Sequence, residues 1–118
     1  MEEGRKKPKI SKEEFLILLK YIDAVDWDTV IENYRLPLRE IDFGSVNSKQ
    51  FWNCISKYQY LPAWFIEKYR DKVDWDIISM YQKLSEPFIE KHKDKVDWYG
   101  ISKFQKLSEE FIEKYQDK

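Results

Sequence analysis

Carboxylates recur at a fixed interval along this chain, and paired carboxylates are the groups from which general acid–base sites are built. Two sets of acids return every 23 residues: Glu67, Glu90 and Glu113, and Asp71, Asp94 and Asp117. An active site is needed only once, whereas these acids return in each copy of the pattern. Helix caps and solvated helix faces explain recurring acids without any chemistry. The sequence therefore predicts no catalytic carboxylate pair.

The other reactive side chains are too few to build a catalytic or metal site. His92 is the single histidine, Cys54 is the single cysteine, and three glycines leave no phosphate-binding loop. His92 stands where two other copies have tyrosine, so we expect it to pack as an aromatic ring. Cys54 should be a small, partly buried thiol, and three recurring serines should make hydrogen bonds within or between helices: Ser56, Ser79 and Ser102. We expect a protein that is not an enzyme and holds neither cofactor nor metal.

The composition indicates one soluble domain. The chain has 118 residues, of which 42% are apolar and 36% charged, with 22 acidic residues against 21 basic ones and a net charge of −1. This balance argues against a broadly basic nucleic-acid binder. No stretch approaches the roughly 20 apolar residues of a membrane span. We expect a disordered basic tail over residues 1–9, no membrane partner and a cytoplasmic location.

The elements that position these side chains come from a repeat of 23 residues. The run Leu61–Trp75 aligns with Leu84–Trp98, and Leu107–Lys118 opens a further copy. Equivalent positions hold the same residue in successive copies: Trp52, Trp75 and Trp98; Ile55, Ile78 and Ile101; Gln59, Gln82 and Gln105; Phe65, Phe88 and Phe111. The repeat is regular over residues 61–118. It is degenerate over residues 10–60, where an irregular segment at residues 38–51 breaks the period.

Each copy has the signals of two short helices. Ser85 and Asp74 are predicted N-caps, and Ser11 with Glu14 forms a capping box. Helices of about nine residues are not stable alone and must bury their apolar residues against neighbouring copies. We therefore predict an all-α fold over residues 10–118, in which pairs of short helices stack into a small solenoid of the right-handed type.

The run Leu-Ser-Glu-Glu-Phe-Ile-Glu-Lys, followed by Asp-Lys-Val-Asp-Trp and by Ile-Ser-Lys-Phe-Gln-Lys-Leu-Ser, resembles the tandem repeats of uncharacterised proteins from large DNA viruses and bacteriophages. The resemblance is clearest over residues 61–118 and weak over residues 1–60. It implies a viral or phage origin and a binding role, with a host factor as the partner and the host cytoplasm as the location. It supplies no catalytic residue.

Large apolar residues at positions that are charged or polar in most copies are candidate partner-binding residues. Tyr60 stands where later copies have lysine, Trp64 where they have proline or glutamate, Met80 where they have lysine, and Tyr99 where they have asparagine or aspartate. Aromatic side chains of this kind are typical anchors of protein interfaces. Alternatively, the irregular segment folds back over Tyr60 and Trp64 and buries them.

The irregular segment is a second candidate for partner binding, because insertions in repeat proteins often form the binding face. It contains Ile41, Phe43 and Val46, and we include Phe43 among the expected binding residues. The alternative is a repeat that has drifted without acquiring a function.

These observations favour a non-catalytic helical-repeat protein that binds another protein and modulates it. Binding of single-stranded nucleic acid by aromatic and lysine side chains is the first alternative. The second is a self-assembling module, since a terminal half repeat offers apolar residues for a homodimer contact: Leu107, Phe111, Ile112 and Tyr115.

Overall fold

The fold is built from short α-helices. The computed structural model describes residues 7–118, and in these residues it has eight α-helices, one short 3₁₀ helix and no strand. The helices are α2 (Lys12–Lys20), α3 (Trp27–Asn33), η1 (Phe43–Ser45), α4 (Lys49–Tyr58), α5 (Ala63–Lys68), α6 (Trp75–Tyr81), α7 (Glu86–Lys91), α8 (Trp98–Phe104) and α9 (Glu109–Lys114). The predicted all-α class is confirmed. None of the helices in residues 7–118 is long and apolar enough to cross a membrane.

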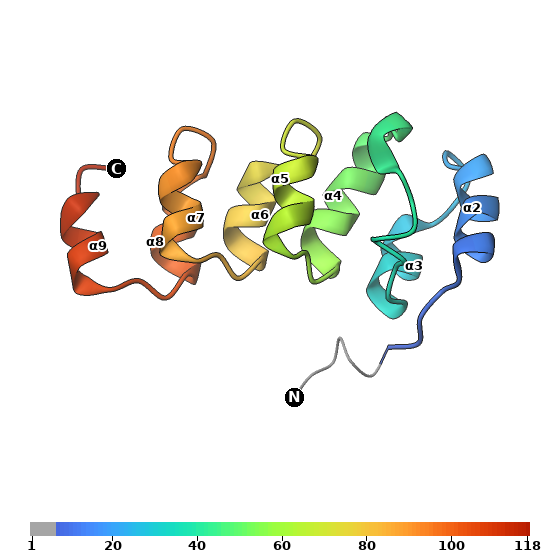
Figure 1. The fold of residues 1–118 in the computed structure, drawn as a ribbon, viewed down its shortest axis with the longest axis horizontal. Helices are drawn as coiled ribbons and strands as arrows, with labels where there is room; N and C mark the ends of the chain where they lie inside the picture. Colours follow the sequence, from blue (N-terminus) through green and yellow to red (C-terminus); the bar gives the residue numbers. More distant parts are fainter. Residues whose placement is uncertain (1–6) are drawn as a thin grey trace.

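The helices follow one another along the longest axis of the molecule, with α2 at one end and α9 at the other (Figure 1). The molecule measures 48 × 31 × 21 Å along its principal axes. Within this row α3 packs on α4, α4 on α6, and α6 on α8. The arrangement is elongated, so each helix contacts only its near neighbours and no single central core holds all of them.

The predicted caps begin the helices where the sequence places them. Ser11 and Glu14 form both hydrogen bonds of the capping box at the start of α2. The Ser85 hydroxyl accepts from the backbone N–H of Phe88, and the Asp74 carboxylate accepts from that of Ile77. Helix α4 has ten residues and helix α5 has six. Helices this short depend for their stability on packing against their neighbours.

A recurring glutamine joins each copy of the repeat to the copy before it. The Nε2 of Gln82 donates to the carbonyl oxygens of Ser56 (2.8 Å) and Gln59 (2.7 Å), and its Oε1 accepts from the backbone N–H of Leu61 (3.0 Å). Gln59 and Gln105 make the equivalent three bonds in their own copies. Each side chain therefore satisfies three backbone groups that the short helices leave unpaired.

Two of the recurring serines strengthen these junctions. Ser56 and Ser79 are fully buried, and each hydroxyl donates to a carbonyl in its own helix at 2.7 Å. Each also accepts a bond from the next copy, at the backbone N–H of Asp74 or Asp97. The prediction that these serines bond within and between helices is confirmed.

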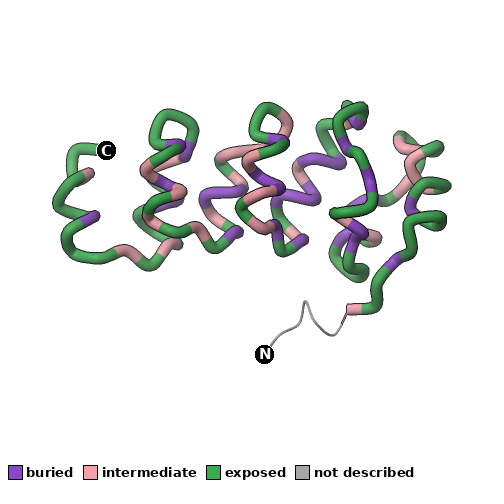
Figure 2. Tube along the Cα trace, in the orientation of Figure 1, coloured by how far each residue is buried: buried purple, intermediate pink, exposed green. Residues whose placement is uncertain are grey.

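Aromatic triads fill the space within each copy. The triads are Trp52–Phe65–Tyr69, Trp75–Phe88–His92 and Trp98–Phe111–Tyr115, with ring centroids 4.6 to 6.3 Å apart. His92 takes the tyrosine place and packs as a ring, as predicted. Burial along the chain is densest around α4 and sparse at α9 (Figure 2).

The irregular segment adds side chains to the core instead of exposing them. Phe43 lies at the start of η1, is 0% exposed, and packs against Phe15, Phe51, Phe65 and other rings. The prediction that Phe43 contacts a partner is wrong. Without a regular helix in residues 38–48, its ring fills the space between α2 and α4, and nothing of it remains to be recognised from outside.

Candidate partner-binding pocket

Tyr60 and Trp64 lie together in one open pocket of about 800 Å³. Tyr60 follows the end of α4, and Trp64 lies in the first turn of α5, so the short α4–α5 connection holds both side chains at one edge of the molecule. Tyr60 is 76% exposed, whereas Trp64 is half-buried. Tyr58, Pro37 and Pro62 complete much of the apolar lining. The volume lies within the range of known small-molecule sites.

The N-terminal segment forms one side of this pocket because Arg35 holds it in place. The backbone N–H of Arg35 donates to the carbonyl of Pro8 at 2.9 Å, and its carbonyl accepts from the backbone N–H of Ile10 at 3.0 Å. The Arg35 Nε donates to the carbonyl of Lys7 at 2.8 Å. Residues 7–9 of the predicted basic tail are thus attached to the domain, while residues 1–6 of that tail lie outside the described residues.

Arg39 covers the indole of Trp64. Its guanidinium carbon lies 4.8 Å from the ring centroid, within the range of a cation–π contact. Arg39 and Trp64 occupy equivalent positions, three residues after Leu36 and Leu61 in successive copies. Leu38, Arg39 and Glu40 all line the pocket. The irregular segment therefore covers part of Trp64, as one of the two alternatives expects, but leaves Tyr60 open.

The indole N–H of Trp64 is buried but has no hydrogen-bond acceptor among the residues that the structure describes. The other four tryptophans each donate to a backbone carbonyl: Trp27 to Ile22, Trp52 to Val46, Trp75 to Arg70 and Trp98 to Lys93. A buried donor without a partner is a cost to the folded state, so the Trp64 site is less completely satisfied than its counterparts.

The charge of the pocket is strongly positive although the chain is close to neutral. Four cations line it, Lys7, Lys9, Arg35 and Arg39, against the single carboxylate of Glu40. The net charge of the whole chain is −1. The basic residues that line the pocket come from three places in the sequence, which is why charge counting along the chain could not detect them.

Two other predicted partner-binding residues lie elsewhere. Tyr99 is 66% exposed on α8, where the Lys103 ammonium donates to its hydroxyl at 3.1 Å. Met80 is half-buried on α6 and faces Gly100 of α8, where a Cβ at position 100 would come within 3.1 Å of its Cγ. Met80 thus packs between helices, and the structure brings neither residue to the pocket with Tyr60 and Trp64.

Sequence comparison within the chain missed a row of exposed and half-buried aromatic rings. Tyr58, Tyr81 and Phe104 end α4, α6 and α8 at the same position of the repeat, and we call them the aromatic row. Tyr81 is 52% and Phe104 54% exposed, and Tyr58 also lines the pocket. A comparison of the copies selects aromatic residues that differ from their equivalents, whereas these three residues are aromatic in every copy. Their position at the helix ends, next to lysines, was the available signal.

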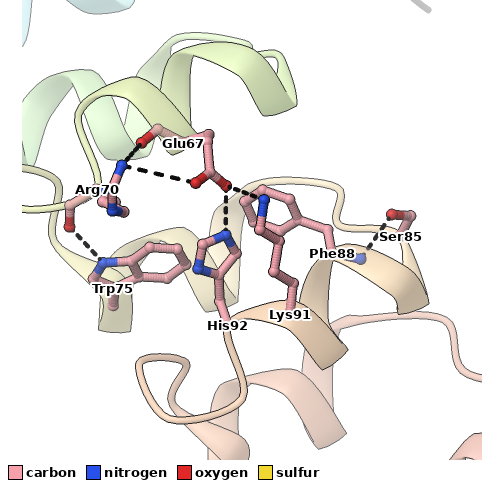
Figure 3. A network of polar contacts seen from close by, with 7 residues as sticks. All are labelled: Glu67, Arg70, Trp75, Ser85, Phe88, Lys91 and His92. Atoms are coloured by element: carbon pink, nitrogen blue, oxygen red, sulfur yellow. Dashed lines mark hydrogen bonds and ion pairs between the residues drawn. The ribbon is translucent and has the colours of Figure 1, made fainter.

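A network of polar contacts lies between copies, around Glu67 (Figure 3). Its Oε1 is 2.8 Å from the buried Nε2 of His92 and 3.3 Å from the ammonium of Lys91, and Arg70 lies 3.7 Å from its other oxygen. The hydrogen bond from His92, followed by that from Lys91, lowers the pKa of the Glu67 carboxyl. The group ties α5 to α7. It has the composition of a structural clamp, without a nucleophile or an open cavity beside it.

Cys54 is a buried thiol, as predicted. Its Sγ donates to the Asp28 carboxylate at 2.9 Å, and burial, with this bond and the charge of Asp28, raises its pKa to about 12. A thiol held in this state does not form the reactive thiolate near neutral pH. Among residues 7–118, no three histidine, cysteine, aspartate or glutamate side chains gather where they could hold a metal ion.

Comparison of the chain with protein-family models, with curated proteins and with solved structures finds no match. The site is therefore interpreted from its own geometry.

Proposed function

We propose that this chain is a small helical-repeat solenoid that binds another protein through the pocket at Tyr60 and Trp64 and modulates that protein without catalysis. The main support for the proposal is that Tyr60 and Trp64 line the same pocket of about 800 Å³. Both residues were selected only because they break the repeat. Aromatic residues in a concave, partly apolar site are the usual anchors of protein recognition.

The arrangement of the helices supports the solenoid part of the proposal. The glutamine bonds recur from Gln59 to Gln82 to Gln105, so each copy is attached to the previous one in the same way. Repeat proteins of this kind contact partners through extended surfaces rather than enclosed active sites. The resemblance to virus and phage repeats supports a host protein as the partner and the host cytoplasm as the location.

A protein partner fits better than a nucleic-acid backbone along the repeated lysines. Lys91 pairs with Glu67 at 3.3 Å, and Lys114 pairs with Glu90 at 3.1 Å. These lysines therefore face carboxylates instead of forming the continuous basic groove that tracks phosphates.

Panning of a random peptide display library on the folded chain tests the proposal. We expect peptides that are enriched by the parent chain and lost with the Tyr60→Ala/Trp64→Ala double variant. Tyr21→Ala is the matched control, because Tyr21 is 63% exposed at the end of α2 and does not line the pocket. Enrichment that survives the double variant, or that is lost equally in the control, would contradict the proposal.

A further inference from the structure

The pocket and the aromatic row form one basic surface. The last turns of α4, α6 and α8, with the residues just beyond them, cover residues 56–60, 79–83 and 102–106. These three stretches contain four lysines (Lys57, Lys83, Lys103 and Lys106) and no carboxylate. Tyr58 belongs both to the row and to the lining of the pocket, so the two features are continuous. With the four cations of the pocket against its single carboxylate, Glu40, the surface is positive on a chain of net charge −1.

Cations lie over the aromatic rings of this surface. The Lys57 ammonium is 5.1 Å from the Tyr58 ring centroid and 5.4 Å from that of Tyr81, so it lies over two successive rings of the row. Arg39 lies over Trp64 in the same way. The charges of Tyr58 and Tyr81, when these phenols ionise, raise the pKa of Lys57.

This arrangement selects among negatively charged partners. A base would have to displace Lys57 or Arg39 in order to stack on a ring. A carboxylate binds those cations where they already lie, and Arg39 offers it the planar, two-point contact that guanidinium groups make with carboxylates. Stacking on Trp64 holds the guanidinium in place and lowers the entropy lost on binding.

The spacing of the row selects the shape of the partner. Stacked helices lie about 8–10 Å apart. A peptide extended in the polyproline II conformation has three residues per turn and rises about 3.1 Å per residue. Side chains three residues apart on such a peptide therefore lie on one face, about 9 Å apart, and match successive rings of the row. The acidic residues between them would then lie near the lysines that flank each ring.

We propose that the occupant of the pocket and aromatic row is an acidic, extended peptide segment with an apolar side chain at about every third residue. This inference rests on the proposed function and narrows it to one class of partner. The apolar side chain at one end enters the pocket beside Tyr60 and Trp64, carboxylates bind Arg39 and Lys57, and the remaining apolar side chains contact Tyr81 and Phe104.

Fluorescence anisotropy with four labelled probes tests the inference on the full chain. The first probe is a peptide of about twelve residues with phenylalanine at every third position and glutamate elsewhere, which spans roughly 40 Å when extended. The second and third replace every glutamate by glutamine or by lysine, and the fourth is decauridylate. We expect the glutamate peptide to bind at least about tenfold more tightly than the others, and its affinity to fall as salt screens the charges.

Variants then locate the binding site. Arg39→Gln and Lys83→Glu change exposed side chains and should keep the fold, which circular dichroism verifies. We expect each to weaken binding of the glutamate peptide by about five- to tenfold. Lys68→Gln is the matched control, because Lys68 is also an exposed cation over an aromatic ring, 5.5 Å from the Tyr69 centroid, but lies outside the pocket and the row. It should leave binding unchanged.

The other outcomes overturn the inference in distinguishable ways. Equal binding of the glutamine peptide, still lost in Tyr60→Ala/Trp64→Ala, would remove the acidic partner but retain the proposed function. Tightest binding of decauridylate would replace both by nucleic-acid binding. Failure of all four probes to bind, or equal weakening by Lys68→Gln and Arg39→Gln, would also overturn the inference.

Discussion

The irregular segment with its neighbouring copies and the last copies of the repeat differ both in sequence and in packing. Residues 61–118 keep a regular period of 23 residues, whereas residues 10–60 are degenerate and interrupted. The larger buried cluster nevertheless runs from Ile10, through the irregular segment, to Ile78 in the first regular copy, while the smaller cluster consists of Ile89, Val96, Ile101 and Phe111. The part of the molecule that contains the irregular segment is therefore the better packed one. A regular sequence therefore indicates that the copies are joined in the same way. It does not indicate how many apolar side chains each copy buries.

The difference arises from how many neighbours each ring has. Phe65 packs against Phe43, Trp52, Trp64 and Tyr69. Phe88, at the same position of the next copy, packs against Trp75 and His92. Phe43, from the irregular segment, adds a buried ring to the core beside α4 and α5. The pocket lies next to this well-packed core, which holds the elements that carry its exposed side chains in place.

The largest expected effect separates these two phenylalanines. Phe65→Ala should lower the free energy of unfolding by about 3–5 kcal/mol, because Phe65 is fully buried among four rings. Phe88→Ala should cost about half as much, since that ring is half-buried and has two ring neighbours. Urea unfolding followed by circular dichroism measures both. Equal losses would contradict the difference in packing between these two successive copies.

A smaller effect tests two successive glutamine junctions. Gln82→Ala should cost about 1–3 kcal/mol, because it leaves buried backbone groups of Leu61, Ser56 and Gln59 without partners. Gln105→Ala removes the same three bonds at a half-buried position, where water can replace them, and should cost less. The difference in urea midpoint between the two variants is the readout. A larger loss of stability for Gln105→Ala would show that the free energy contributed by these bonds does not increase with burial.

The pH dependence of stability tests the junction between α5 and α7. Because the hydrogen bond from His92 lowers the pKa of Glu67 in the folded state, its contribution is present above the ordinary carboxyl value and is lost as the pH falls through the folded value. Glu67→Gln should therefore be less stable than the parent at neutral pH, and the difference should shrink in acid. Thermal unfolding from about pH 3 to pH 7 measures this. Glu113→Gln, an exposed residue at the same repeat position, should show no such trend.

The smallest expected effect on stability belongs to the pocket. Tyr60→Ala should change the free energy of unfolding by less than about 0.5 kcal/mol, since the side chain is 76% exposed. The same variant should reduce the peptide enrichment described above. A large loss of stability would show that Tyr60 serves the fold rather than recognition.

Much of the fold could be predicted because each signal is local. The N-caps at Ser11, Asp74 and Ser85 and the period of 23 residues place the helices, and the serine bonds follow from positions that repeat. The fate of Phe43 could not be predicted in the same way. A residue in a segment without period carries no indication of which side faces inward, and only the packing of Phe15 and Phe51 around it decides.

The site could be predicted only in part. Tyr60 and Trp64 were detectable because equivalent positions in other copies are charged or rigid. Arg35 and Arg39 were not, since they reach the pocket from a different copy and their role depends on distance in space. Tyr81 and Phe104 repeat faithfully, and a comparison of copies cannot distinguish a repeated core residue from a repeated exposed one.

Site-specific photocrosslinking tests the central claim most directly. With p-benzoylphenylalanine in place of the exposed Tyr60, irradiation in a cell lysate should give a discrete protein adduct, and excess glutamate–phenylalanine peptide should abolish it. The same substitution at Tyr21, which is also exposed but lies outside the pocket, should give no such adduct. Identical adducts from both positions, or adducts to nucleic acid alone, would contradict the claim that this pocket binds a protein.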